Sequence, residues 1–428
     1  MFYVIADDLT GANDTGVQFA KNNYKTMVSI FKDKSLDVVI PDDLDVLVID
    51  TETREIGEKN ARHRIKKILK KLNITKEDIV YKKVDSTLRG NIGVEIEEII
   101  NILKKDICIF SPSFPSHQRI TVGGYLIVQQ KPLGFSEYSS NSSEHGENSF
   151  ISHLLKKQTN LSIGQIDLRE VSRGSEVILR RIEDLFQKGN KIIVVDSTNE
   201  EHLKDIFASS LKFKGSVLFS GSAGLANHFS QIFTKKEKPK KNINNKATIA
   251  IVIGSRNPLA MTQIEYLKGK IKFEEIKIDL ENVFTNKEKI LDKYISIGIK
   301  SVKNNNHLLI YTDAVYNNKE KINKKLMLER NLSFRDLEVK IKEIFGEIVF
   351  KVIQESSLRK LILTGGDIAL GVCKELGISN LTILDELLPG IPLSIAYYKN
   401  TDLNIITKAG GFGEEDTLYR LINNFKKY

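Results

Sequence analysis

Short apolar segments alternate along the first half of the chain with longer segments in which apolar residues recur every three or four positions. The first kind is typical of buried strands, and the second of amphipathic helices. The apolar segments are YVIA (3–6), DVLVID (45–50), IVYKKV (79–84), DICIFSP (106–112), KIIVVDS (191–197) and SVLFSG (216–221). Helical periodicity follows most of them, for example over 54–72 and 91–104. This alternation predicts βαβ units and a largely parallel sheet.

The alternation stops at TKKEKPKKNINNK, residues 234–246, and begins again after it. The apolar segments of the second half are TIAIVIG (248–254), EEIKIDL (274–280), HLLIYT (307–312), KLILTG (360–365) and LNIITKAG (403–410), and one long helix is expected over 333–357. A chain of 428 residues also favours two cores over one. We therefore predict an α/β protein with two domains, residues 1–233 and 247–428, joined by a basic linker over 234–246. Each domain is expected to be a largely parallel sheet flanked by helices, with an interdomain cleft.

Composition and charge indicate which classes of ligand the protein is expected to bind. The hydrophobic fraction of 41% fits a globular protein, and the formal net charge is +9. A nucleic-acid-binding protein would concentrate such charge on one face with interleaved aromatic residues, whereas these lysines are scattered. The charge is better suited to anionic small substrates.

The two cysteines, Cys108 and Cys373, lie far apart in apolar stretches and have no zinc-site spacing, as expected in a reducing cytoplasm. The seven histidines also lack metal-ligand spacing, so we predict no protein-bound metal site. No signal peptide and no apolar run of about 18–20 residues is recognisable, so we expect a cytoplasmic protein without a membrane partner. The sequence leaves a homodimer open.

Ligands of open α/β sheets bind beyond the carboxyl ends of the strands, so the residues that follow each strand are candidates. In the first half these residues are charged. They include Asp7, Asp8, Lys83, Asp85, Arg89 and Arg119. Arginine can hold a carboxylate through two parallel hydrogen bonds, and aspartates accept hydrogen bonds from hydroxyl groups. This mixture predicts a site for a small polyhydroxylated anion.

The loops of the second half are rich in glycine and nearly free of charge. They read GSRNP from 254, TGGDIALG from 364 and KAGGFG from 408. Glycine allows close backbone approach, and the free N–H groups of helix N-termini bind phosphate. An anionic substrate on one domain and phosphates on the other together indicate phosphoryl transfer.

Each signal also has a structural alternative. Asp7 or Asp8 could cap the following helix, and Arg89 could pair with Asp85 or Glu95. Gly365 and Gly366 could simply form a tight turn.

Two functions other than phosphoryl transfer are alternative interpretations of the sequence. A dinucleotide-dependent dehydrogenase of sugar acids would need a complete G-x-G-x-x-G fingerprint, which is missing. A non-catalytic sugar-acid sensor would not need two glycine-rich phosphate loops. No P-loop or G-x-S-x-G motif is present either.

Seven motifs in this order resemble the four-carbon acid sugar kinase family. They are ADDLTGANDTG, KKVDSTLRGNIG, PSFPSHQRITVGGYLIV, SGSAGLA, TGGDIA, LLPGIPL and TKAGGFG, and they span nearly the whole chain. The resemblance implies an N-terminal domain that binds the sugar acid and a C-terminal domain that binds ATP. It implies phosphorylation of D-threonate, D-erythronate or a 3-oxo-tetronate at the 4-hydroxyl.

Position by position, the resemblance assigns Asp7, Asp8, Asp85, Arg89 and Gly124 to the acid-sugar site, and Ser255, Gly365, Gly366, Asp367 and Gly410 to the nucleotide. We expect Asp8, or second Asp85, to accept the proton of the attacking hydroxyl. We expect Arg89, helped by a lysine, to hold the substrate carboxylate, and the N–H groups of Gly410 and Gly411 to stabilise the transferred group. Mg²⁺ is expected to arrive with ATP. The polar loop over 135–149 lacks the Asp-Pro stretch that the family usually has there, which leaves the substrate choice open.

Overall fold

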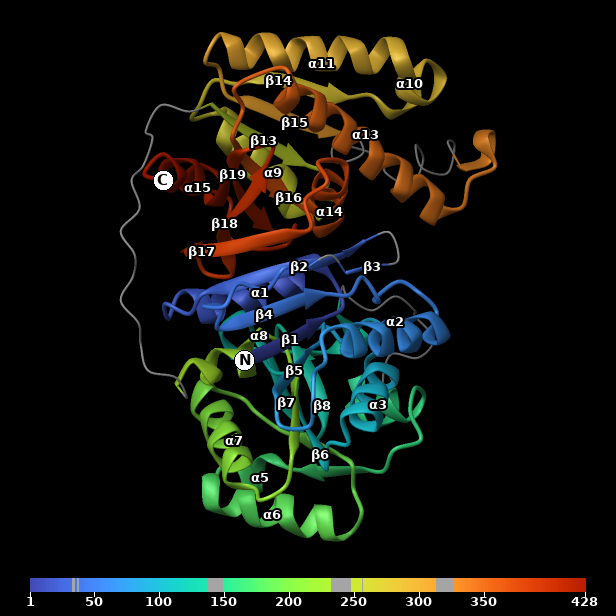
Figure 1. Ribbon diagram of the computed structural model, residues 1–428, viewed down its shortest axis with the longest axis vertical. Coiled ribbons are helices and arrows are strands. Elements are labelled where there is room, and N and C mark those ends of the chain that lie inside the picture. Colours follow the sequence, from blue (N-terminus) through green and yellow to red (C-terminus); the bar gives the residue numbers. More distant parts are fainter. Residues whose placement is uncertain (33–34, 37, 137–148, 232–247, 256, 313–326) are drawn as a thin grey trace. The chain divides into compact units, whose positions relative to one another are not determined.

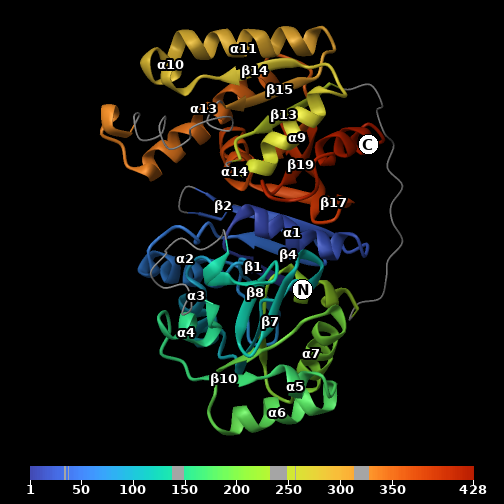
Figure 2. The same cartoon turned by 180° about the vertical axis from the view of Figure 1, so that it is seen from behind.

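The computed structural model describes residues 1–32, 35–36, 38–136, 149–231, 248–255, 257–312 and 327–428. The predicted basic linker over 234–246 and most of the loop over 135–149 lie outside these ranges. The chain divides into two compact units, Met1–Lys236 and Glu237–Tyr428. Each unit is an α/β structure (Figures 1 and 2).

Unit 1 is built on one long sheet. The strands are β1 (Phe2–Ala6), β2 (Thr26–Lys32), β3 (Ser35–Leu36), β4 (Val46–Asp50), β5 (Ile79–Lys83), β6 (Ile107–Ser111), β10 (Ile163–Ile166), β11 (Ile192–Val195) and β12 (Val217–Gly221). Their order is β10-β11-β6-β12-β5-β1-β4-β2, with every pair parallel, and β3 pairs antiparallel with β2. A separate antiparallel sheet contains β7 (Arg119–Val122), β8 (Tyr125–Val128) and β9 (Lys131–Pro132).

Helices cover both faces of this sheet. They are α1 (Leu9–Ala20), α2 (Glu58–Lys71), α3 (Ile92–Leu103), α4 (Ile151–Lys156), α5 (Leu168–Val171), α6 (Ser175–Gln187), α7 (Glu200–Lys212) and α8 (Ala223–Ala226), with short 3₁₀ turns at Pro115–His117, Leu133–Phe135 and Asn227–Gln231. On one face α2, α3 and α4 bury their apolar stripes against alternate strand residues such as Tyr3 and Ile5. On the other face Phe2 packs against Phe19 of α1 and Phe229. Every residue of β1 is buried, as a central parallel strand requires.

Unit 2 has a mixed sheet. Its strands are β13 (Ile249–Ile253), β14 (Glu274–Ile278), β15 (Leu308–Thr312), β16 (Lys360–Thr364), β17 (Asn380–Leu388), β18 (Ile391–Tyr398) and β19 (Thr401–Lys408). The order β14-β15-β13-β16-β19 is parallel, and β18 and β17 extend it as antiparallel strands.

The helices of unit 2 are α9 (Pro258–Lys268), α10 (Leu280–Thr285), α11 (Lys287–Lys303), α13 (Phe334–Gln354), α14 (Gly366–Glu375) and α15 (Thr417–Phe425). Helices α9 and α15 pack on one face of the sheet around Ile251 and Ile406. Helix α11 packs against α13, and α13 packs against α14. Among the described residues, no helix is both long and apolar enough to cross a membrane.

The structure confirms the α/β class and all eleven predicted strands. Two differences matter for the site. The helix predicted over 54–72 begins only at Glu58, because residues 51–57 form the loop after β4. Strands β2, β17 and β18 are among those that were not predicted. Cys108 and Cys373 are buried and form no disulfide bond with each other.

Candidate functional site

Two aspartates follow β1 at the carboxyl edge of the unit 1 sheet. The Asp8 side chain caps helix α1, because its Oδ1 accepts a hydrogen bond of 2.8 Å from the Gly11 N–H. The capping alternative thus holds for Asp8. The Asp7 carbonyl accepts hydrogen bonds from the backbone N–H groups of Thr53 (3.0 Å) and Arg54 (3.2 Å), which ties the loop after β1 to the loop after β4.

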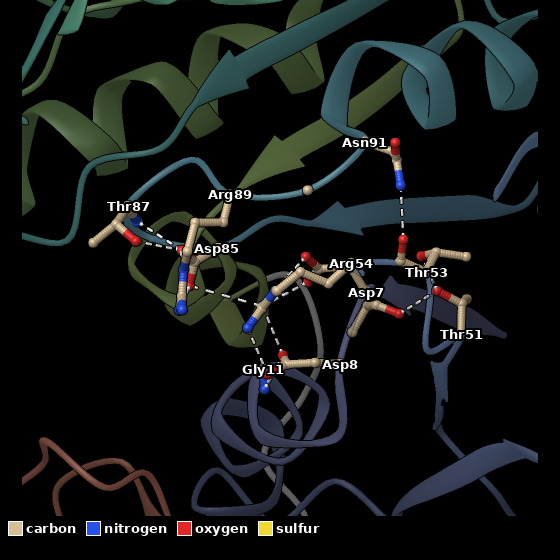
Figure 3. Close-up of polar contacts among 12 residues, drawn as sticks. Asp7, Asp8, Gly11, Thr51, Thr53, Arg54, Asp85, Thr87, Arg89 and Asn91 are labelled. Atoms are coloured by element: carbon tan, nitrogen blue, oxygen red, sulfur yellow. Dashed lines mark hydrogen bonds and ion pairs between the residues drawn. The ribbon is translucent and has the colours of Figure 1, made fainter. Parts of the chain in front are cut away.

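Arg54, which was not among the predicted site residues, joins the aspartates (Figure 3). Its Nε and Nη2 donate to the two carboxylate oxygens of Asp7 at 2.8 and 2.9 Å. Its Nη1 and Nη2 donate to Asp8 at 2.6 and 2.8 Å. Nη2 also lies 3.7 Å from Oδ1 of Asp85. One guanidinium therefore faces three carboxylates, which belong to the loops after β1 and β5.

Neighbouring residues hold Arg54 in this position. The Asn91 side chain, directly before α3, donates to the carbonyls of Thr53 (2.8 Å) and Ile56 (2.7 Å), which fixes the loop on both sides of Arg54. Gly90 has a φ of +93°, and a Cβ there would lie 3.2 Å from Oδ2 of Asp7 and 3.4 Å from Cα of Arg54. A glycine is therefore needed at this close approach.

Asp85 lies directly after the loop residue Val84, at the end of β5, and is tightly bound. Arg89 donates to it through Nε (2.7 Å) and Nη2 (3.0 Å), and the Thr87 hydroxyl donates to the same carboxylate. Of the two alternatives for Arg89, the pair with Asp85 is the one observed, while Glu95 pairs with Lys82 in the core. We call Asp7, Asp8, Arg54, Asp85 and Arg89 the Arg54 cluster.

The pKa values of the three carboxylates are shifted in different directions. Burial opposes ionisation of Asp7 and Asp85, but the arginines outweigh it: Arg54 holds the pKa of Asp7 below its usual range, and Arg54 and Arg89 hold that of Asp85 far below. For Asp8, burial together with the neighbouring carboxylates Asp7 and Asp85 raises the pKa despite Arg54. Asp8 is therefore the most basic carboxylate of the cluster. Its side chain is 23% exposed, against 4% for Asp7.

Two further cations, Arg89 and Lys83, lie beside these carboxylates. Arg89 uses Nε and Nη2 on Asp85, its side chain is 54% exposed, and within the described part of the chain its Nη1 has no partner. Lys83 is buried beside Asp8, since a Cβ built on Gly11 would lie 2.7 Å from Oδ1 of Asp8 and 2.9 Å from Nζ of Lys83. With Arg54 they balance the charges of the three aspartates, so an added anion would meet no net negative charge.

The other two predicted residues of the acid-sugar site lie in the β7–β8 hairpin. Arg119 donates to the His117 carbonyl. The Gly123 and Gly124 N–H groups donate to Asp196 at 2.6 and 2.9 Å. The hairpin is thereby attached to the end of β11, and a role of Arg119 and Gly124 in substrate binding stays a prediction.

In unit 2, three loops meet at the carboxyl ends of adjacent strands. A Cβ on Gly410 would lie 1.8 Å from Oγ of Ser255, and a Cβ on Gly365 would lie 3.6 Å from the Ser255 nitrogen. The Gly365 N–H donates to the Lys408 carbonyl at 2.9 Å. The predicted residues Ser255, Gly365 and Gly410 are therefore neighbours, as the strand order β13-β16-β19 requires.

The remaining predicted residues of unit 2 surround this junction. Gly366 opens α14, whose N-terminus has Gly365 as its cap residue and no capping side chain, so its first N–H groups are available to an anion. The exposed Asp367 pairs with Lys342 of α13. A Cβ on Gly411 would lie 2.9 Å from Nδ2 of Asn257, which caps α9. A glycine-lined backbone and an open helix N-terminus fit a nucleotide phosphate.

Sequence reasoning missed Arg54 and Asp50. Arg54 was assigned to a helix, although it belongs to TETR, the four residues directly after the predicted strand DVLVID, where a ligand-binding loop is expected. Asp50 ends β4 and is fully buried, and burial, with Glu52 and Asp8 nearby, raises its pKa well above the ordinary value. This burial favours the neutral form of Asp50 beside the Arg54 cluster.

Two protein-family models match this chain. A family model for a sugar-binding N-terminal domain matches residues 2–229, and one for a nucleotide-binding C-terminal domain matches residues 250–418. The chain belongs to the four-carbon acid sugar kinase family. Its relatives in this kinase family include a D-threonate kinase of Salmonella typhimurium (28% identical, 97% of this chain and 96% of the relative) and a D-erythronate kinase of Heliobacterium modesticaldum (26%, 96% and 94%).

A 3-oxo-tetronate kinase of Pseudomonas fluorescens is a further member of the kinase family, 24% identical over 96% of this chain and 94% of its own. A solved structure from Salmonella typhimurium LT2 has a TM-score of 0.80 at 20% identity and covers 98% of both chains. One from Haemophilus influenzae has a TM-score of 0.74 at 22% identity, over 99% and 100%. These structures share the fold. As a member of the kinase family, the protein is a phosphotransferase.

Proposed function

We propose that the protein uses ATP to phosphorylate the terminal (4-) hydroxyl of a four-carbon sugar acid: threonate, erythronate or a 3-oxo-tetronate. The observation that carries the proposal is the Arg54 cluster at the carboxyl edge of the unit 1 sheet. There, a carboxylate with a raised pKa lies beside the cations Lys83 and Arg89, and Arg89 has a donor without a partner in the described part of the chain. The names of the relatives support the same substrate class.

In this proposal each residue of the cluster has one task. Arg89 and Lys83 bind the substrate carboxylate, and Arg54 holds the aspartates in place. Asp8 accepts the proton of the attacking hydroxyl, because one lone pair of its Oδ2 is left after the bonds to Arg54 and Gly11. Asp85, our second candidate, is a weaker base because Arg54 and Arg89 hold its pKa so low.

The glycine junction of unit 2 fits the nucleotide, with Ser255, Gly365, Gly366, Gly410 and Gly411 around its phosphates. ATP would supply the transferred phosphoryl group and Mg²⁺ would neutralise part of its charge. Asp367 is kept as a candidate nucleotide contact, although it pairs with Lys342 here.

Measurement of ADP release with a panel of three- to six-carbon sugar acids tests the function. We expect release with at least one four-carbon acid, and release near the level without acid for the matching four-carbon polyol, which lacks the carboxylate. Tight binding of an acid without ADP release would favour a sensor, and reduction of NAD would favour a dehydrogenase. Either result would overturn the kinase proposal.

Replacement of Gly410 by alanine tests the nucleotide site. The new Cβ would lie 1.8 Å from Oγ of Ser255 and 2.8 Å from its Cβ, so the loop after β19 must move. We expect ATP affinity, measured by calorimetry, to fall about tenfold or more, because overpacking typically costs about 1–3 kcal/mol.

Gly269→Ala is the matched control in the same unit. The atoms nearest to its Cβ lie 3.5 and 3.8 Å away, and its φ is −69°, so alanine fits without strain. Equal ATP affinities of the two variants would show that the nucleotide does not approach Gly410.

A further inference from the structure

Lys408, the last residue of β19, has a side chain that the proposed mechanism leaves unexplained. The residue is 2% exposed, and its Nζ donates to the carbonyls of Ala409 (2.9 Å) and Gly410 (3.4 Å). An ammonium group has three donors, so two neutral carbonyls do not satisfy it. A buried cation is costly unless an anion compensates it.

No anion of the described residues compensates Lys408. Charged groups on the neighbouring elements have other partners: Asp367 of α14 pairs with Lys342, and Asp416 before α15 pairs with Arg420. The cation Lys268 of α9 pairs with Glu275. Lys360 lies at the opposite end of β16. Lys374 of α14 and Glu265 of α9 each lie about two turns from the start of their helix. Burial alone shifts Lys408, and it lowers the pKa to about 7.

A second buried polar group lies beside Lys408. Thr364 is its partner in the β16–β19 ladder, and cross-strand partners project to the same face of a sheet. The Thr364 residue is fully buried, and its Oγ1 has no hydrogen-bond partner among the described residues. Both groups lie at the strand ends where Gly365 and Gly410 meet Ser255. Among the described residues, the Lys408 ammonium has no anionic partner and the Thr364 hydroxyl has no hydrogen-bond partner. A cation and a hydroxyl in this state, at loops lined by glycine, are donors that suit a phosphate.

We propose that Lys408 is the phosphate-binding cation of the nucleotide site, and that it takes up a proton when ATP binds. The inference rests on the proposed function, because it takes ATP as the ligand. In the free protein Lys408 is mostly neutral above pH 7, and phosphate charge beside Nζ stabilises its protonated form. Above pH 7, ATP binding therefore adds a proton to this side chain, and below pH 7 the proton is already present.

Calorimetry of ATP with Mg²⁺, without sugar acid, in two buffers of different ionisation enthalpy measures this uptake. We expect about 0.9 proton at pH 8 and about 0.1 at pH 6, as linkage gives for a group with a pKa of about 7. Lys408→Met should abolish the uptake and lower ATP affinity at least about tenfold, since it removes a charge-assisted hydrogen bond. Lys408→Arg should also abolish the uptake, because arginine stays protonated.

Lys360→Met is the matched control. Lys360 is also a buried lysine of this sheet, with its Nζ on the Phe425 carbonyl at 3.2 Å, but it lies at the other end of the strands. Its replacement should leave the proton uptake unchanged. Should the Lys408 variants fail to fold, the pH dependence of uptake by the unaltered protein still decides, with its midpoint expected near pH 7.

The outcomes separate the two proposals. The role of Lys408 would be overturned if ATP bound without proton uptake at pH 8, or if Lys408→Met bound ATP with unchanged affinity. In either case, ADP release with a sugar acid would still support the kinase proposal. Absence of both ATP binding and ADP release would overturn the kinase proposal and this inference together.

Discussion

Asp8→Asn is expected to lower kcat by about 10²–10⁴-fold, the usual contribution of a positioned general base. The amide cannot accept the hydroxyl proton, but its oxygen can still accept the 2.8 Å hydrogen bond from Gly11 and cap α1. The fold should therefore be kept while the chemistry is lost. Steady-state kinetics with the acid identified in the ADP-release panel, together with circular dichroism, measure both effects.

The pH profile makes this test specific to proton transfer. Because the pKa of Asp8 is raised, kcat/KM of the unaltered enzyme should rise with pH as Asp8 loses its proton, and Asp8→Asn should remove this acid limb. Asp85→Asn should affect substrate binding more than the rise of kcat/KM with pH. The pKa of Asp85 lies far below its usual value, so Asp85 is already ionised where this rise occurs.

Asp279→Asn is the control for the capping role. Asp279 caps α10 in unit 2 through a 3.0 Å hydrogen bond from the Asn282 N–H, so the same replacement is made at the same kind of position. It should leave kcat unchanged. A near-normal kcat in Asp8→Asn would remove Asp8 as the base.

Arg54→Ala is expected to lower the free energy of unfolding by about 3–5 kcal/mol at neutral pH, because it leaves buried carboxylates without their partner. Arg54 makes four hydrogen bonds to Asp7 and Asp8, and its side chain is 12% exposed. Activity should be lost as well, since Asp8 is then no longer positioned. Urea unfolding with the acid absent measures the stability.

The loss should depend on pH with a definite sign. Asp7 and Asp85 have folded pKa values below their unfolded values, so they stabilise the unaltered protein above about pH 4 and lose that effect as the pH falls. Without Arg54 the burial of Asp7 favours its neutral form instead. The difference in stability between the two proteins should therefore shrink as the pH is lowered from 7 towards 4.

Arg62→Ala is the control for an exposed pair. Arg62 of α2 contacts Glu97 and Glu98 of α3, but its side chain is 38% exposed, so about 1 kcal/mol or less is expected. Adding Asp7→Asn to Arg54→Ala should recover part of the stability, because it removes a buried charge. Equal losses in the two single variants would show that the Arg54 cluster does not act as a buried network.

Arg89 gives a third comparison within the cluster. It pairs with Asp85 alone among the carboxylates of the described residues and is 54% exposed. Its replacement by alanine should therefore cost less stability than that of Arg54, and should mainly raise the KM for the acid. An equal effect with an uncharged sugar analogue would contradict its role as carboxylate ligand.

The order of residues alone is enough to predict the fold class, the strands that carry the loops, and one end of each sheet as the place of the chemistry. Apolar segments of about five residues followed by helical periodicity can be buried on both faces only in a parallel sheet, and parallel strands place their following loops at one edge. Asp7, Asp8, Asp85 and Gly410 could therefore be selected before any contact was known.

The partners of these residues depend on the packing of the folded chain. Arg54 lies 46 residues after Asp8, and nothing local marks it, because its position depends on β4 lying beside β1 in the register that pairs Ala6 with Asp50. The unpredicted strand β2 lies on the far side of β4, which buries Asp50 between neighbouring strands.

The pKa values of the site carboxylates also depend on this packing. Asp7 and Asp8 are adjacent and chemically identical, yet their pKa values move in opposite directions. Burial opposes ionisation of both, but Arg54 outweighs it for Asp7, whereas the neighbouring carboxylates add to it for Asp8.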